Sequence, residues 1–151
     1  MARITVIDDD NDTLDLFREI FTEYGYETEV HSGAMPGIRH LVRSRPDAIV
    51  VDLQLDPHRQ ELTGLQLIHS VRSSRVLRDV PVIVCSADVQ LLHDSWPELV
   101  GRGDIHMLEK PFDLATLDRL LELALGEAAP SLLPLGTLPA EDRAQEEEEE
   151  A

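Results

Sequence analysis

The feature that most constrains this chain is the run Ala48-Ile49-Val50-Val51, which is followed at once by the acidic residue Asp52. The run is apolar without alternation and rich in β-branched residues, which is typical of a strand covered on both faces inside a parallel sheet. Asp52 therefore falls where the predicted strand ends. Ligands of open α/β sheets bind at the carboxyl ends of the strands, so Asp52 is a candidate site residue.

The same pattern of an apolar strand followed by polar residues occurs three more times. Residues 4–7 run into Asp8-Asp9-Asp10, residues 82–85 run into Ser86, and Met107-Leu108 runs into Glu109-Lys110-Pro111. Each element alone has a simpler explanation, since a strand-end acid often caps a helix and Lys-Pro often marks a turn. Together, parallel strands would bring several acids, one hydroxyl and one amine into a single pocket.

Segments with strand character alternate with segments of helical periodicity along the chain. Strands are predicted at residues 3–7, 27–31, 48–51, 81–85 and 105–108, and helices at residues 12–24, 38–42, 64–71 and 114–125. Asn11 or Asp12 is the expected cap of the first helix, and Pro97 is expected to interrupt any helix between residues 88 and 103. This alternation predicts an α/β fold, doubly wound, with helices on both faces of a parallel sheet.

The charge of the chain excludes some partners. The 151 residues include 13 basic and 30 acidic side chains, for a formal net charge of −17. Such a chain repels phosphate backbones and anionic lipids, so we expect neither nucleic acid nor a membrane as a partner. The single Cys85, the lack of a signal peptide and the lack of a membrane-spanning run favour a cytoplasmic location. The six histidines include no pair at i, i+4 spacing, so a zinc site is not expected.

The composition changes after Gly126. Residues 128–140 contain three prolines, and the chain finishes in Glu146–Glu150. A segment of this kind buries too little apolar surface to offset its ordering entropy. We therefore expect a folded domain at residues 1–127 and a disordered acidic tail at residues 128–151, which either solubilises the protein or docks a basic partner.

The predicted pocket suits phosphoryl chemistry. Clustered carboxylates raise one another's pKa unless a cation neutralises them, and Mg²⁺ prefers oxygen ligands. A carboxylate such as Asp52 can attack phosphorus and form an aspartyl-phosphate. Lys110 and Ser86 would then hold the phosphoryl oxygens.

These motifs resemble the receiver domain of two-component response regulators. The matching segments are Val6-Ile7-Asp8-Asp9-Asp10, Val51-Asp52-Leu53, Val84-Cys85-Ser86-Ala87 and Glu109-Lys110-Pro111-Phe112. The resemblance covers roughly residues 2–126, in the family's order and near its spacing. It implies a flavodoxin-like fold with five parallel strands in the order 2-1-3-4-5.

The resemblance also implies a mechanism, in which Asp52 accepts a phosphoryl group from a histidine kinase or phosphotransfer protein. Mg²⁺ would be bound by Asp9, Asp52 and the main-chain carbonyl of Gln54, and by Asp8 through water. The groups implied to contact the phosphoryl oxygens are the side chains of Ser86 and Lys110 and the backbone N–H groups of Gln54 and Ala87. A protein of this kind is a phosphoacceptor that promotes its own phosphotransfer and dephosphorylation, not a conventional enzyme.

The chain departs from the family pattern at three places. The loop at residues 56–63 is about four residues longer than usual, and Trp96-Pro97 falls in the fourth helical region. Gln54 and Asp88 occupy positions that tune the lifetime of the phosphoryl group in the family. Met107 stands at the switch position, which is usually aromatic and responds when Ser86 moves. Methionine packs adaptably, so we expect weaker coupling between the pocket and a partner surface.

Two other functions compete with this interpretation. A phosphatase of the haloacid dehalogenase type also uses a strand-end Asp and Mg²⁺, but it requires a second Asp where Gln54 stands. A phosphorylation-independent receiver-like scaffold remains an alternative because of Met107. The favoured hypothesis is a stand-alone receiver that switches binding to an unknown downstream protein.

Overall fold

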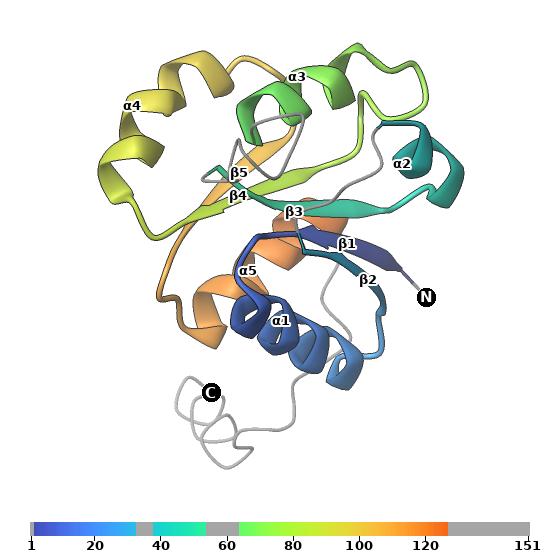
Figure 1. The fold of residues 1–151 in the computed structure, drawn as a ribbon, viewed down its shortest axis with the longest axis vertical. Helices are drawn as coiled ribbons and strands as arrows, with labels where there is room; N and C mark the ends of the chain where they lie inside the picture. The colour runs from blue at the N-terminus through green and yellow to red at the C-terminus, as the bar shows by residue number, and fades with distance from the viewer. Residues whose placement is uncertain (1, 33–37, 54–63, 127–151) are drawn as a thin grey trace, which may run out of the picture.

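The computed structural model describes residues 2–32, 38–53 and 64–126, in which strands and helices alternate (Figure 1). The strands are β1 Arg3–Ile7, β2 Glu27–His31, β3 Ala48–Asp52, β4 Val82–Ser86 and β5 Ile105–Glu109. The helices are α1 Asn11–Glu23, α2 Ile38–Ser44, α3 Gly64–Ser73, α4 Val89–Leu99 and α5 Leu114–Leu125. The predicted order of elements is confirmed, and α4 is the helix that the sequence pattern did not resolve.

The five strands form one parallel sheet in the order β2-β1-β3-β4-β5. This is the predicted flavodoxin-like topology, with β3 at the centre and β2 and β5 at the edges. Every residue of β3 and β4 is buried, which explains why their sequences are apolar without alternation.

Two apolar layers enclose the sheet. Helices α1 and α5 cover one face, and α2, α3 and α4 cover the other (Figure 1). Because side chains alternate along a strand, β3 sends Ile49 and Val51 to the three-helix face and Val50 to the two-helix face. The central strand is thus fixed from both sides, and so is the acid that follows its apolar run.

Two local expectations are wrong. The cap of α1 is Asp10, whose carboxylate accepts the N–H of Asp12 at 3.1 Å, while Asn11 is already helical. Helix α4 continues through Pro97 to Leu99. Pro97 is exposed, whereas the opposite face of α4 is buried against the sheet, so packing outweighs the one backbone hydrogen bond that proline forfeits.

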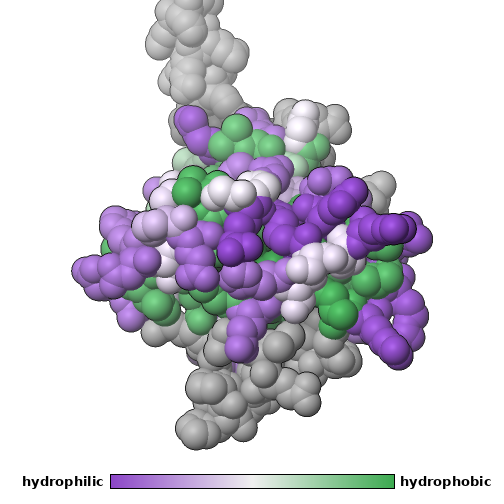
Figure 2. Space-filling model, turned by 90° about the horizontal axis from the view of Figure 1, so that it is seen from above, coloured by the Kyte–Doolittle hydropathy of each residue, from purple (hydrophilic) through white to green (hydrophobic). Residues whose placement is uncertain are grey.

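The face of the molecule that Figure 2 shows is largely polar. Hydrophilic residues cover most of this face, and hydrophobic residues lie between them in small separate groups. Among the described residues, no helix has the length and apolarity needed to cross a membrane. The predicted boundary at residues 127 and 128 and the loop at residues 56–63 lie outside the described residues.

Gly64 brings the start of α3 against the end of β3. A Cβ atom at this position would lie 2.5 Å from the carbonyl oxygen of Asp52 and 2.7 Å from the Cα of Leu53. Both are backbone atoms of a buried strand end and cannot swing aside. Glycine at this position therefore permits a close helix–strand contact directly beside Asp52.

We expect Gly64→Ala to destabilise the fold by about 1–3 kcal/mol, because the added methyl group forces backbone apart in a packed region. Chemical denaturation measures the change in the free energy of unfolding. Gly101→Ala is the matched control, since nothing lies within 4 Å of a Cβ at Gly101. Equal stability of the two variants would contradict this account of the close contact.

Candidate functional site

The strand register gathers polar residues at one edge of the sheet. Strands β1 and β3 are paired up to their carboxyl ends, so Asp8 and Asp52 lie side by side. Strands β4 and β5 are paired in the same way, and the N–H of Lys110 donates to the carbonyl oxygen of Ser86 at 2.9 Å. Residues from four separate parts of the sequence therefore meet at the carboxyl ends of the four strands.

Lys110 joins the two acids of this edge. Its Nζ lies 2.8 Å from Oδ2 of Asp8 and 3.3 Å from Oδ2 of Asp52. Asp8 is only 2% exposed and Asp52 only 6%, so both carboxylates are held away from bulk water. The ammonium group marks a point on which oxygen atoms from two strands converge.

The protonation states follow from these contacts. Burial lowers the pKa of Lys110, but the hydrogen bond to Asp8 and the charges of Asp52 and Asp8 outweigh that effect and raise it. Lys110 therefore stays an ammonium ion at neutral pH. Burial raises the pKa of Cys85, beside Asp52 in β4, to about 12. This thiol is neutral and therefore unsuited to act as a nucleophile or metal ligand.

The hydroxyl and the neighbouring acids surround this centre. Ser86 is fully buried, and its Oγ accepts the N–H of Asp88 at 3.0 Å. Asp9 follows Asp8 and is half-buried. The second oxygen of Asp8 accepts the N–H of Asp10 at 2.9 Å, which fixes the orientation of the Asp8 carboxylate.

The donor set suits a hard divalent cation. In the described part of the chain, the carboxylates of Asp8 and Asp52 contact the ammonium of Lys110, and Asp9 adds a third acid next to Asp8. The excess of negative charge and the converging oxygen atoms are what Mg²⁺ requires of a protein site. These side chains would hold such an ion.

Comparison with known proteins settles the family. Residues 4–122 match the family described as the response regulator receiver domain. The chain belongs to this family. Receiver domains are phosphoacceptors of two-component signalling and not enzymes in the ordinary sense.

Two curated relatives are longer than the part of them that this chain matches. It is 30% identical over 133 residues to the transcriptional regulatory protein GlrR of Escherichia coli K12, covering 86% of this chain and 28% of the relative. It is 29% identical to the response regulator MprA of a Mycobacterium species (strain KMS), covering 85% of this chain and 53% of MprA. The chain thus spans between about a quarter and a half of these curated relatives.

A solved structure agrees in fold. The receiver domain of the sensor histidine kinase PA1611 from Pseudomonas aeruginosa PAO1 superposes with a TM-score of 0.70 at 25% identity, covering 83% of this chain and 98% of that one. That crystal structure has a magnesium ion coordinated in its active site cleft.

The receiver brings together most of the residues singled out from the sequence. Asp8, Asp52 and Lys110 are in direct contact, and Ser86 and Asp9 adjoin them. Ala87 is exposed immediately after Ser86. Met107 is half-buried on β5, where it pairs with Val84 and packs against the layer containing α3 and α4. Gln54 lies outside the described residues.

Sequence reasoning named Phe112 and Asp88 but did not find the supporting contacts that they make. The ring of Phe112 stacks on Phe17 of α1 with centroids 5.2 Å apart, which anchors the segment that carries Lys110. The carboxylate of Asp88 accepts the N–H of Leu91 and so caps α4. The contact of Phe17 with Phe112 joins distant parts of the sequence, whereas the cap at Asp88 is a local signal, an acid three residues before Leu91.

We expect Lys110→Met to lower the free energy of unfolding by about 1–3 kcal/mol near neutral pH without Mg²⁺, because two buried carboxylates lose their cation. The pKa of Lys110 is raised above 10.5, so its contribution is complete below 10.5 and is lost as the pH rises through the raised value. Urea unfolding at a series of pH values measures the difference between the proteins.

Arg119→Met is the control for this substitution, since it removes one positive charge from an exposed position of α5. We expect it to change stability by less than about 0.5 kcal/mol. If the two variants are equally stable, or if the Lys110 contribution vanishes between about pH 7 and 9, the ion contacts do not stabilise the receiver.

Proposed function

We propose that this receiver accepts a phosphoryl group on Asp52 from a histidine kinase or phosphotransfer protein, in a reaction that requires Mg²⁺, and that phosphorylation switches binding to a downstream protein. The observation that carries the proposal is the convergence of Asp8 and Asp52 on the ammonium of Lys110. An acid beside a fixed cation at a strand end is placed for attack on phosphorus.

The transfer reaction uses groups of this chain in distinct roles. An oxygen of the Asp52 carboxylate attacks the phosphorus of a phosphohistidine, an O–P bond forms and the P–N bond breaks. The electron pair of the broken bond goes to the imidazole nitrogen, which leaves as a neutral ring once protonated. Lys110 contacts the transferred oxygens, and Ser86 donates its hydroxyl to one of them. The backbone N–H groups of Gln54 and Ala87 complete this set of donors.

A bound divalent ion would neutralise negative charge on the Asp52 carboxylate and on the transferred phosphoryl oxygens. Asp9, Asp52 and the main-chain carbonyl of Gln54 would hold it directly, and Asp8 through water. The magnesium ion in the PA1611 receiver supports this choice of ion. Asp8 is oriented for the role because it accepts the N–H of Asp10.

The downstream partner in this proposal is a protein. The formal net charge of −17 disfavours direct contact of this chain with nucleic acid or an anionic membrane. A surface depression lined by Met107, Pro111, Phe112 and Thr116 lies beside the strand end that carries Lys110. A partner bound there would sense changes in the pocket through β5 and the segment that follows it.

We expect a small-molecule phosphodonor with Mg²⁺ to label Asp52, and Asp52→Asn to reduce the labelling to background, because an amide is not a nucleophile toward phosphorus. Asp9→Asn should weaken Mg²⁺ binding strongly, since one of few charged ligands is lost. Intact-protein mass spectrometry and a Mg²⁺ titration measure the two effects.

The matched control is Asp15→Asn, which removes a carboxylate from an exposed position of α1. It should be labelled like the unaltered protein. Labelling of Asp52→Asn at that same level would show that the phosphoacceptor lies elsewhere.

Met107 gives the scaffold alternative its one support. Where the family usually has an aromatic side chain that moves as a rigid block, Met107 can fill the space in several rotamers. Two states with similar packing differ little in free energy, which weakens coupling between the pocket and a partner. We therefore propose a switch in which part of the response passes through the loop at residues 56–63.

We expect Met107→Tyr to enlarge the change in hydrogen exchange that fluoroberyllate, an acyl-phosphate analogue, produces over β5 and α5. The measurement is hydrogen–deuterium exchange with and without the analogue, with Asp52→Asn as the unresponsive control. If fluoroberyllate changes hydrogen exchange over β5 and α5 as strongly in the unaltered protein as in Met107→Tyr, the coupling between the pocket and this surface is not weak. No response in either protein would favour the phosphorylation-independent scaffold.

A further inference from the structure

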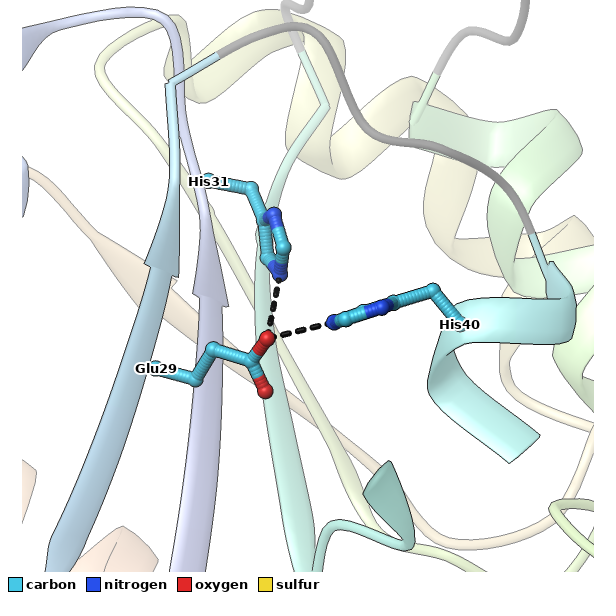
Figure 3. A group of neighbouring side chains, drawn as sticks. All are labelled: Glu29, His31 and His40. Atoms are coloured by element: carbon cyan, nitrogen blue, oxygen red, sulfur yellow. Dashed lines mark hydrogen bonds and ion pairs between the residues drawn. The ribbon is translucent and has the colours of Figure 1, made fainter. Parts of the chain in front are cut away.

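A second cluster of ionisable side chains lies at the edge of the sheet, across β2 and α2 (Figure 3). Glu29 and His31 come from β2, and His40 comes from α2. Nε2 of His31 lies 3.2 Å from Oε2 of Glu29, and Nε2 of His40 is in close contact with the same oxygen. One ligand atom of each residue lies within 4.8 Å of the others.

We propose that Glu29, His31 and His40 form a binding site for a Zn²⁺-like transition-metal ion that links α2 to the edge strand. The site is separate from the carboxylate pocket, and the proposal does not depend on phosphorylation of Asp52.

The spacing of the ligand atoms suits a tetrahedral ion. With metal–ligand bonds of about 2.0–2.2 Å, two ligand atoms of tetrahedral zinc lie roughly 3.3 Å apart. The distance of 3.2 Å between His31 and Glu29 already matches this value. The two imidazole rings stand nearly perpendicular, at 81°, with centroids 5.0 Å apart. Their nitrogen atoms converge on one carboxylate oxygen, so small side-chain rotations would admit an ion among the three.

The chemistry of the three groups selects the kind of ion. Two imidazole nitrogens and one carboxylate oxygen form a set typical of zinc sites that leave a fourth position for water. Imidazole favours zinc, copper and nickel, whereas Mg²⁺ and Ca²⁺ favour oxygen alone. The carboxylate pocket at Asp8 and Asp52 and this His–Glu cluster should therefore take different ions.

The environment favours the protonation states that metal ligands need. Burial lowers the pKa of His31, so its ring is neutral at physiological pH. Burial opposes ionisation of Glu29, but the hydrogen bond and charge of His40, together with His31, lower its pKa overall. Nε2 of His31 is shielded from solvent and has no well-directed hydrogen bond to the described residues. A metal ion would satisfy this nitrogen better than the 3.2 Å contact with Glu29 does.

An ion at this cluster would restrain parts of the fold that are otherwise lightly held. Strand β2 is an edge strand, and α2 buries only Leu41. The carbonyl oxygen of His31 also accepts the N–H of Asp8 at 3.2 Å. Metal binding would therefore fix α2 and the strand end beside the first acid of the carboxylate pocket.

The test is a Zn²⁺ titration of the full chain, with excess Mg²⁺ present to occupy the carboxylate pocket and a chromophoric chelator as competitor. We expect the protein to bind one equivalent of zinc tightly. We expect His40→Gln to lower the zinc affinity about 10-fold to 100-fold. His40→Cys should retain binding, because a thiolate is also a zinc ligand. His69→Gln is the matched control, since within the described ranges His69 pairs with a single carboxylate, that of Glu98.

A second measurement keeps the test independent of any effect of the substitutions on folding. Nitrogen-detected NMR of the unaltered protein should show the ring resonances of His31 and His40 shifting together at one equivalent of zinc, while the ring of His69 does not shift. Equal zinc affinity of the unaltered protein and His40→Gln would overturn the proposal, and so would unshifted His31 and His40 rings at saturating zinc. In either case the cluster is a hydrogen-bonded packing contact without a metal.

Discussion

The structure depends on the ion contacts between Lys110 and two buried acids. Asp8 and Asp52 are almost entirely removed from water, and two adjacent buried carboxylates repel each other unless a cation lies between them. Lys110 supplies that cation at 2.8 Å and 3.3 Å. Among the described residues, the same arrangement leaves the pocket with more acids than bases. That imbalance makes the pocket suited to a divalent ion.

The fold can hold this charge because its core is packed on both faces of the sheet. β3 and β4 are buried along their full length, and Gly64 lets α3 approach the backbone of Asp52 within van der Waals distance. The ring of Phe112 stacks on Phe17, and this packing restrains the segment after Lys110. The acids and Lys110 therefore lie at the ends of packed strands, and preorganised groups need little rearrangement if a reaction takes place there.

Two polar clusters of different chemistry lie at neighbouring strand ends. The pocket at Asp8 and Asp52 offers oxygen atoms and an ammonium, whereas the cluster of Glu29, His31 and His40 offers two imidazoles. They are joined by one backbone hydrogen bond, from the N–H of Asp8 to the carbonyl of His31. A restraint on β2 would thus reach the pocket through the sheet itself.

The sequence by itself determined the strands, the fold class and the acids at the strand ends. An apolar β-branched run followed by Asp52 is a local pattern, and alternation with amphipathic helices leaves few ways to arrange a parallel sheet. Only the tertiary structure decided that Asp10 caps α1, that α4 continues through Pro97 and that His31 meets His40. A search for i, i+4 histidines misses that meeting, although the Glu29-x-His31 pair on one face of a strand hints at it. Neighbouring residues offer similar local caps at the start of α1, whereas the course of α4 and the meeting of His31 with His40 depend on packing between elements, whose energies a local pattern does not contain.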